Sequence, residues 1–470
     1  MAKPRVIVIS DLHISAGPLD DCDQELESCL VGFFGELFQD NGSAELVING
    51  DFLDFVQAPP WSGPELESES PQGIPLCFKE EHSLAKLEAI FGAHATVFES
   101  LREFLNANPQ NKLVILPGNH DADFFWASVR SRFVELVCGK NAALPDRLRL
   151  HLEPVYRPPN FARVWIEHGH QYDETNSFFV SGNPCWSQEN PPIFEDQEGQ
   201  MRLYECVGTR LLIQFVNQLE VHYPFVDNIK PFSRFLRVFA TSALVRGYGP
   251  LRASVTVWNM FGFLASRLRR RPSDVLSLEE EDRRHPRFLL LDAINRLAHS
   301  EQRAFSQKLE ERGFPLDRPL AMVLEDAELA EPFLKFLATH LDLLESLPEA
   351  DESYLSTAPE EGMLSLGKGF FKDETKELIG AARTIVQSDA AEAVIMGHTH
   401  ETVKNPPALK YVNTGCWTRY YRFDGEEKLG SWRLLKSASY DTFPYQLNYA
   451  EIVPAHDTAV HLITYREKLS

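Results

Sequence analysis

The sequence predicts a layered α/β protein that is interrupted by a large, mainly helical insertion. Three observations lead to this fold class. Short runs rich in Val and Ile end abruptly at polar clusters, helix-like stretches separate the early runs, and more than 200 residues lie between two of the later clusters. The chain has 470 residues, which exceeds the size at which one hydrophobic core stops growing, so we expect at least two domains.

Six short apolar runs are expected to form strands that are buried on both faces. Between the second and third runs, Leu84–Leu105 carries apolar residues at 3.6 spacing and predicts a helix. Strands that alternate with helices favour a layered core. Near the end of the chain, Tyr449–Val453 and Ala459–Tyr465 are predicted to add two closing strands. The six runs are Val6–Ser10, Glu45–Asn49, Lys112–Leu116, Arg163–Glu167, Ala393–Met396 and Tyr411–Val412.

The long stretch between His170 and His398 is predicted to be an insertion or lid, because a crossover connection needs only about 30 residues. We therefore expect a core formed by residues 1–180 and 390–470, with residues 181–389 inserted into it. Helix-like patterning in and beside this insertion covers Met201–Leu219, Pro231–Ala240, Leu251–Arg271, Phe288–Glu311, Leu329–Leu344 and Asp373–Ser388.

Composition and charge restrict the classes of partner. The formal net charge is −22, so contact with nucleic acid or an anionic membrane would need a local basic patch. The seven cysteines are scattered and form no CxxC pair, which indicates free thiols in a reducing compartment. The first residues enter an apolar strand without a signal peptide, and no long uncharged apolar run occurs. A cytoplasmic protein is expected.

One segment of the insertion, residues 228–273, is locally basic. It contains no Asp or Glu but nine cationic residues, interleaved with aromatic and aliphatic ones. Such a segment can lie on an anionic membrane surface, here the inner face of the membrane, or bind a lipid tail together with its phosphate. It can equally pack as ordinary core with arginine stems that extend to water. On the first interpretation Arg267 and Arg269 are candidate substrate contacts.

Five polar clusters follow predicted strands directly. In open α/β sheets ligands bind at the carboxyl ends of strands, so these side chains are expected along one edge although they are far apart in sequence. Asp, His and Asn ligands without thiolate suit Mn²⁺, Fe or Zn²⁺. The set exceeds what one tetrahedral ion needs and fits two ions about 3.5–4 Å apart that share a carboxylate. The clusters are Asp11-x-His13, Asp51 and Asp54 in GDFLD, Asn119-His120-Asp121, His168-x-His170 and His398-x-His400.

The order DxH, GDxxD, GNHD, HGH and GHTH resembles the calcineurin-like metallophosphoesterase superfamily over roughly residues 5–180 and 390–470. The resemblance implies an α-β-β-α sandwich with two divalent ions, with Mn²⁺ expected and Fe or Zn²⁺ as alternatives. It also implies that Asp51 bridges the ions, that His120 protonates the leaving oxygen or stabilises the transition state, and that Asp54 orients His120. By the same resemblance, one ion is held by Asp11, His13, Asp51 and His400, and the other by Asp51, Asn119, His168 and His398.

Within the superfamily, the chain resembles the bacterial type and is distantly similar to UDP-diacylglucosamine pyrophosphatase, which works at a membrane surface. That branch has Arg at the position of His120 and is much shorter, so its substrate does not carry over. Protein Ser/Thr phosphatases are disfavoured, because Phe55 and Val56 follow GDFLD where they carry Arg-Gly, and Asp121 stands where they carry Glu.

The sequence therefore predicts a hydrolase of phosphomonoester, phosphodiester or pyrophosphate bonds. The expected substrate is a phosphorylated small molecule, and lipid-linked and nucleotide-linked molecules are among the candidates. A metal-dependent nuclease is the alternative, although the acidic chain disfavours nucleic acid. A non-catalytic binding module is a third hypothesis, disfavoured because every expected ligand is present. His170 and Asp173 are candidates for substrate contact or for orienting His168, and Asn119 is a candidate substrate contact as well as a ligand.

Overall fold

The structure is a computed structural model. It describes residues 5–39, 42–60, 78–141, 143–173, 175–180, 183–196, 199–206, 208–209, 212–216, 227–230, 299–316, 318–326, 329, 332–333, 336, 374–406, 409–422, 440–453 and 459–468. Contacts divide the chain into two compact units. Unit 1 comprises Met1–Ser233, Lys372–Asp424 and Gly430–Ser470, and unit 2 comprises Arg234–Phe371 and Gly425–Leu429. The predicted boundaries at residues 180 and 390 stay predictions.

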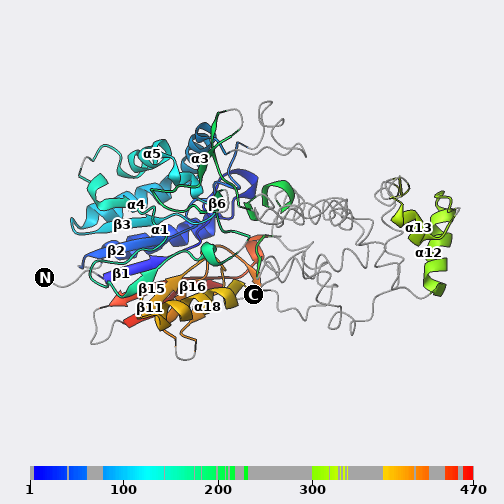
Figure 1. Ribbon diagram of the computed structural model, residues 1–470. Helices are drawn as coiled ribbons and strands as arrows, with labels where there is room; N and C mark the ends of the chain where they lie inside the picture. Colours follow the sequence, from blue (N-terminus) through cyan, green and yellow to red (C-terminus); the bar gives the residue numbers. More distant parts are fainter. Residues whose placement is uncertain are drawn as a thin grey trace. The chain divides into compact units, whose positions relative to one another are not determined.

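The larger sheet of unit 1 has six strands in the order β16-β15-β1-β2-β3-β4 (Figure 1). Strands β1 to β4 are parallel, whereas β15 runs antiparallel to β1 and to β16. The strands predicted at Val6–Ser10, Glu45–Asn49 and Lys112–Leu116 are confirmed as β1, β2 and β3. The two predicted closing strands are β15 and β16, which extend the sheet beside β1. The strands are β1 (Arg5–Ile9), β2 (Ala44–Asn49), β3 (Lys112–Leu116), β4 (Leu148–Leu150), β15 (Tyr445–Val453) and β16 (Ala459–Lys468).

The second sheet has four strands in the order β12-β13-β11-β5. Strands β13, β11 and β5 are parallel, and β12 is antiparallel to β13. It joins strands from both sides of the insertion, because β11 pairs Ile395 with Ile166 of β5. The strands are β5 (Val164–Ile166), β11 (Ala393–Met396), β12 (Val403–Lys404) and β13 (Tyr411–Asn413).

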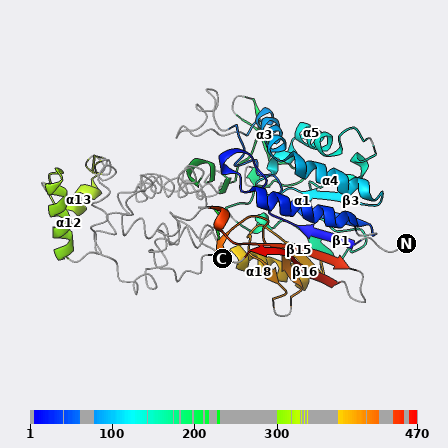
Figure 2. The same cartoon turned by 180° about the vertical axis from the view of Figure 1, so that it is seen from behind.

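Alternating side chains of these strands build three separate cores. In β1, Ile7 and Ile9 face the helices, whereas Val6 and Val8 belong to a core shared with Ile395 of the second sheet. The two sheets therefore pack face to face, with helices α1, α3, α4 and α5 over the first sheet and α18 over the second (Figures 1 and 2). This is the expected α-β-β-α sandwich. The helices are α1 (Gln24–Gln39), α3 (Glu80–Ala93), α4 (Ala95–Ala107), α5 (Ala127–Cys138) and α18 (Glu374–Gln387).

The helical pattern predicted over Leu84–Leu105 is confirmed, but the structure divides it between two helices that meet at His94. The backbone of His94 leaves the helical region (φ −125°, ψ 39°). Its ring contacts two carboxylates of the first helical layer, with Nε2 at 2.7 Å from Asp20 and Nδ1 at 3.0 Å from Glu27. These tertiary contacts favour a break that the apolar spacing does not reveal.

The helical pattern predicted over Met201–Leu219 is wrong at its start, whereas residues 208–209 and Leu212–Val216 are helical. Met201–Leu203 forms strand β9, which pairs with β8, and the Leu203 amide donates to the carbonyl of Phe78. Tertiary pairing thus overrides the helical pattern at this point. The short elements of this region and its partners are β6 (Phe179–Val180), β7 (Asn183–Pro184), β8 (Ile193–Glu195), β9 (Met201–Leu203), the π-helical turn η5 (Leu212–Val216), β10 (Ile229–Lys230) and β14 (Tyr421–Arg422).

In unit 2, the described helices are α12 (His299–Glu311) and α13 (Leu320–Glu325). The predicted helices at Pro231–Ala240 and Leu251–Arg271, and all of segment 228–273 beyond residue 230, lie outside the described residues. Among the helices that the structure describes, none is long and apolar enough to cross a bilayer. The six described cysteines are buried free thiols. Short 3₁₀ turns complete the fold at Gly17–Leu19 (η1), Ala122–Phe125 (η2), Pro145–Arg147 (η3), His170–Tyr172 (η4) and Tyr440–Thr442 (η7).

Candidate metal centre

All seven predicted metal ligands lie in loops that leave the carboxyl ends of parallel strands, as the sequence predicts. The first sheet supplies four of them after β1, β2 and β3, and the second sheet supplies the other three after β5 and β11. Five of the seven have a positive φ, in the left-handed region that residues other than glycine rarely adopt. The five are Asp11 (φ 55°), His13 (46°), Asp51 (49°), His398 (70°) and His400 (58°).

Such conformations cost about 1–3 kcal/mol each and persist only where the surroundings impose them. Here backbone hydrogen bonds tie the loops to one another. The amides of Leu12 and His13 donate to the carbonyl of Asp51 (2.9 and 3.0 Å), and the amide of His398 donates to Oδ1 of Asp11 (2.9 Å). Clustered strain of this kind is typical of functional sites.

Two motif glycines provide the space in which the loops meet. A Cβ on Gly118, in GNHD, would lie 2.2 Å from Oδ1 of Asp51. A Cβ on Gly397, in GHTH, would lie 2.3 Å from Oδ2 of Asp11. Any larger residue would push these carboxylates away from the centre, so the close approach requires glycine at both positions.

The first group of candidate ligands contains Asp11, His13, Asp51 and His400, all buried. One ligand atom from each lies within 4.8 Å of the others. Nε2 of His13 lies 2.9 Å from Nε2 of His400 and 3.8 Å from Oδ2 of Asp51. Imidazole nitrogens that converge on each other beside carboxylates match the donor set for a divalent transition-metal ion.

The second group contains Asp51, His168 and His398, again within 4.8 Å. Nε2 of His168 lies 3.1 Å from Oδ2 of Asp51 without the geometry of a hydrogen bond, while Nδ1 of His168 lies 2.9 Å from the carbonyl of Asn49. That carbonyl can only accept, so Nδ1 carries a proton, and Nε2 is the ring nitrogen that could bind an ion in place of a proton. Oδ1 of Asn119 is also buried and has no hydrogen-bond partner among the described residues. These unpaired donor atoms fit a second cation.

The charges of the centre also fit a cation. Burial raises the pKa of Asp11. Burial alone would raise that of Asp51 as well, but His168 and His120 hold it well below its ordinary value. Although burial opposes the charge on His168, Asp51 and Asp11 raise the pKa of this imidazole to about 10. The buried carboxylates therefore demand positive charge close by, which divalent cations supply.

A third group joins His13 and His120 to the fully buried carboxylate of Asp54. Oδ2 of Asp54 lies 2.7 Å from Nδ1 of His120 and 3.0 Å from Nδ1 of His13. Burial opposes ionisation, but the two imidazoles hold the pKa of Asp54 well below its usual range. Both Nδ1 atoms therefore donate to a carboxylate. The His120 side chain is 19% exposed, so of the two it is the one that solvent or substrate can reach.

Asp121 has a role that the sequence analysis missed. Its carboxylate accepts hydrogen bonds from the amides of Phe52 (2.9 Å) and Gly118, and thereby joins the GDFLD loop to the GNHD loop. Burial and the neighbouring Asp51 raise the pKa of Asp121 well above its ordinary value. Its place as the last letter of GNHD is the one sequence signal that marks it.

Asp173 contacts a different ligand from the one expected. Its Oδ2 lies 3.2 Å from Nε2 of His398, whereas His168 is oriented by the carbonyl of Asn49. Oδ1 of Asp173 accepts from the amide and the hydroxyl of Thr175 (2.8 and 2.7 Å). The carboxylate is thus fixed by its own loop and in turn orients His398.

His170 is fully buried, and neither ring nitrogen has a hydrogen-bond partner among the described residues. Its ring lies 4.4 Å from that of Trp186 and 5.5 Å from that of His168, which favours packing behind the centre. Burial lowers the pKa of His170 well below its usual value. The other two predicted substrate contacts, Arg267 and Arg269, lie outside the described residues.

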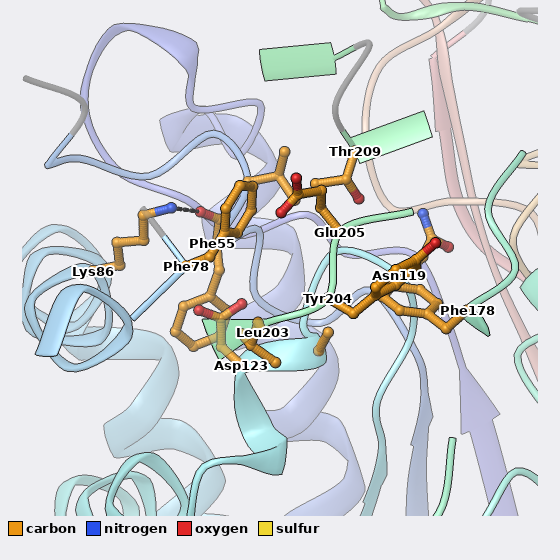
Figure 3. Close-up of a pocket in the computed structure, with 12 residues that line it drawn as sticks. Phe55, Phe78, Lys86, Asn119, Asp123, Phe178, Leu203, Tyr204, Glu205 and Thr209 are labelled. Atoms are coloured by element: carbon orange, nitrogen blue, oxygen red, sulfur yellow. Dashed lines mark hydrogen bonds between the residues drawn. The ribbon is translucent and has the colours of Figure 1, made fainter. Parts of the chain in front are cut away.

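A pocket adjoins the candidate metal ligands at Asn119 (Figure 3). The cavity has a volume of about 20 Å³, which is room for about one water molecule. We call it the aromatic pocket. It is lined by Phe55, Val56, Phe78, Lys86, Asn119, Ala122, Asp123, Phe178, Leu203, Tyr204, Glu205 and Thr209.

Comparison with known families gives one match. Residues 4–205 match the model of the family described as calcineurin-like phosphoesterase. The match includes five of the seven candidate ligands and His120, while His398 and His400 follow it in sequence. No curated protein matches the chain.

Proposed function

We propose that this protein, a metal-dependent hydrolase of phosphate esters whose residues 4–205 match the calcineurin-like phosphoesterase family, works through two divalent ions that would share Asp51 as a ligand. The observation that carries this proposal is the shared carboxylate. Asp51 belongs both to the group with Asp11, His13 and His400 and to the group with His168 and His398.

The residues fit two ions. Asp11, His13, Asp51 and His400 would hold one, and Asp51, Asn119, His168 and His398 would hold the other. The mixture of oxygen and imidazole ligands suits Mn²⁺, with Fe or Zn²⁺ as alternatives. When bound, such ions lower the pKa of water to near neutrality and neutralise charge on the phosphate.

His120 is proposed to supply the proton that the leaving oxygen needs. Its Nδ1 donates to the ionised Asp54, so the opposite ring nitrogen is the one that can exchange a proton with substrate. Asp54 acts as a positioning residue, because it touches His120 and His13 rather than the reacting atoms. General acid catalysis of this type contributes about 10²- to 10⁴-fold in rate.

The substrate bond is proposed to be a phosphomonoester, phosphodiester or pyrophosphate in a small or lipid-linked molecule. We also propose that the basic segment 228–273 contacts an anionic membrane. The support is its composition, because the segment has no acidic residue and nine cationic ones. Nuclease activity is the competing assignment, and the same assay can separate the two.

The test measures hydrolysis by the purified full chain with Mn²⁺. The substrates are p-nitrophenyl phosphate, bis-p-nitrophenyl phosphate, a nucleoside diphosphate ester, and single-stranded DNA and RNA. Asp51→Ala removes the carboxylate common to both ion sites and should lower the rate by at least about 10³-fold, which corresponds to about 4 kcal/mol. Asp146→Ala changes an exposed carboxylate of unit 1 and should leave the rate unchanged. Equal activity of Asp51→Ala and the wild type would refute the proposed centre, and preferential cleavage of nucleic acid would favour the nuclease.

A further inference from the structure

We propose that Asn413, the last residue of β13, is a positioning residue that fixes the distance between the two proposed ions. Its side chain holds the turn at residues 397–400, which supplies one histidine to each group of candidate ligands. The proposal rests on the proposed function, because it concerns the geometry of that same centre.

The turn at residues 397–400 contributes to both ion groups. His400 belongs to the first group of candidate ligands and His398 to the second, and only Thr399 separates them in the chain. Both histidines have a positive φ (58° and 70°), a conformation that persists only where the surroundings impose it. A shift of this turn would therefore move a ligand of each ion.

The amide group of Asn413 contacts this turn at two points. Nδ2 donates to the carbonyl of Gly397 (2.7 Å) and to Oγ1 of Thr399 (3.1 Å). The first acceptor precedes His398, and the second lies between the two histidines. The side chains of Asn413 and Thr399 are buried, so these hydrogen bonds are shielded from water and are stronger than exposed ones.

The orientation of the Asn413 amide is itself fixed. Oδ1 accepts from the amide of Gly415 (2.9 Å), two residues later, which is a common turn of asparagine. Gly415 has a φ of 72°, and a Cβ there would lie 2.5 Å from Oγ1 of Thr402, so this turn requires glycine. With the oxygen directed to Gly415, the two N–H donors face Gly397 and Thr399. A carboxylate in this place would put a second acceptor against the carbonyl of Gly397.

The segment 413–417 also contacts the loop that carries the DLH motif. Oγ1 of Thr414 lies 2.6 Å from Oγ of Ser10, and the amide of Trp417 donates to the carbonyl of Asp11 (2.9 Å). One short segment thus connects the loop of a carboxylate ligand with the turn of two histidine ligands. This arrangement makes Asn413 a residue that positions ligands without being one.

The experiment measures the spacing and the affinity of Mn²⁺ in the full chain. Two Mn²⁺ ions that share a carboxylate give a spin-coupled EPR spectrum, whereas distant ions give the spectrum of isolated Mn²⁺. Asn413→Leu keeps a side chain of similar bulk but removes both donors and the acceptor. It should lose the spin-coupled spectrum and weaken the binding of both ions, measured by calorimetry, by about 10- to 100-fold, the usual effect of losing an outer hydrogen-bond partner.

Asn111→Leu is the matched control. Asn111 is equally buried, and its Oδ1 accepts from the amide of Ala44 (3.0 Å) while its Nδ2 donates to the carbonyl of Phe104 (2.8 Å), without contact to a candidate ligand. This variant should lower the free energy of unfolding as Asn413→Leu does, yet keep the spin-coupled spectrum. Loss of coupling in both variants would reveal a general effect of destabilisation and refute the positioning role.

Thr399→Val is a milder second variant. It keeps the shape of the side chain and removes only the acceptor of one hydrogen bond from Asn413, so the fold should be retained. It should weaken the binding of both ions by about 2- to 10-fold. If Asn413→Leu does not fold, wild-type Mn²⁺ affinities in Thr399→Val would overturn the proposal.

Failure of this inference can be told from failure of the proposed function. If the wild type gives a spin-coupled spectrum and Asn413→Leu retains both that spectrum and the wild-type affinities, the role of Asn413 alone is wrong. If the wild type binds two Mn²⁺ ions without spin coupling, or binds only one, the proposed centre is wrong and the role of Asn413 is refuted with it.

Discussion

The Asp173→Asn substitution is expected to weaken one of the two proposed ion sites by about 10- to 100-fold, the usual effect of removing a hydrogen-bond partner from a metal-binding histidine. The structure explains why an isosteric change suffices. Oδ1 of Asp173 accepts two hydrogen bonds from Thr175, and Oδ2 faces both Nε2 of His398 (3.2 Å) and Nδ2 of Asn176 (2.7 Å).

An amide in this place can keep its oxygen toward Thr175, but its NH₂ group then faces two other donors. His398 loses its acceptor, and its ring is no longer held toward Asp51 and His168. The expected loss of affinity corresponds to about 1.4–2.8 kcal/mol and should fall on the ion held by Asp51, Asn119, His168 and His398, with the other ion little affected.

The assay is calorimetric titration of Mn²⁺ into the metal-stripped full chain, fitted with two sites. Asp196→Asn is the matched control, because Asp196 also ties its own loop, through the amide of Gln200 (2.8 Å) and Nε of Arg202 (2.6 Å), without contacting a candidate ligand. If Asp173→Asn binds both ions as the wild type does, Asp173 does not orient His398 and the reasoning fails.

Two further predictions concern His120 and His94. His120→Gln should lower the kcat for an ester with an alkyl leaving group by about 10²- to 10⁴-fold. The kcat for a p-nitrophenyl ester should change much less, because nitrophenolate leaves without a proton. Equal losses of kcat on both esters would argue against proton donation by His120. Although burial opposes the charge on His94, Asp20 and Glu27 raise its pKa above the ordinary value of 6.5. Its stabilising contribution is therefore complete below about pH 6.5 and is lost as pH rises through the raised folded-state value. Urea unfolding at about pH 6 and pH 9 should show a larger difference between the wild type and His94→Gln at the lower pH, and a constant difference would contradict the ion pairs.

The sequence predicts the layered α/β core and the ligand loops because both depend on local signals, whereas the α-β-β-α sandwich is what the family resemblance implies. Apolar runs such as Lys112–Leu116 mark buried strands, and polar motifs directly after them fall at one sheet edge by the geometry of parallel strands. The break at His94 could not be predicted, since it depends on carboxylates distant in the chain. Strand β9 likewise depends on pairing with β8, which the helical spacing of Met201–Leu219 conceals.

The finer features of the site escape prediction for the same reason. Positive φ at Asp11 and His398 is imposed by hydrogen bonds between loops, which the residue types alone do not predict. The aromatic pocket is lined by Lys86 of α3, Asp123 of η2 and Tyr204, which follows β9. No periodicity or motif links these positions, because the contacts exist only after the layers have packed.

The strand pairing of the second sheet explains how one centre can use ligands that are separated by more than 200 residues. β5 and β11 are hydrogen-bonded neighbours, and the amide of Gly397 donates to the carbonyl of His168 (2.9 Å), so the HGH and GHTH loops leave the sheet side by side. The entropic cost of closing a loop grows only with the logarithm of its length, so the intervening segment can be long at little cost to the pairing. The backbone positions of His168 and His398 are therefore set by one pair of strands, however long the segment between them is.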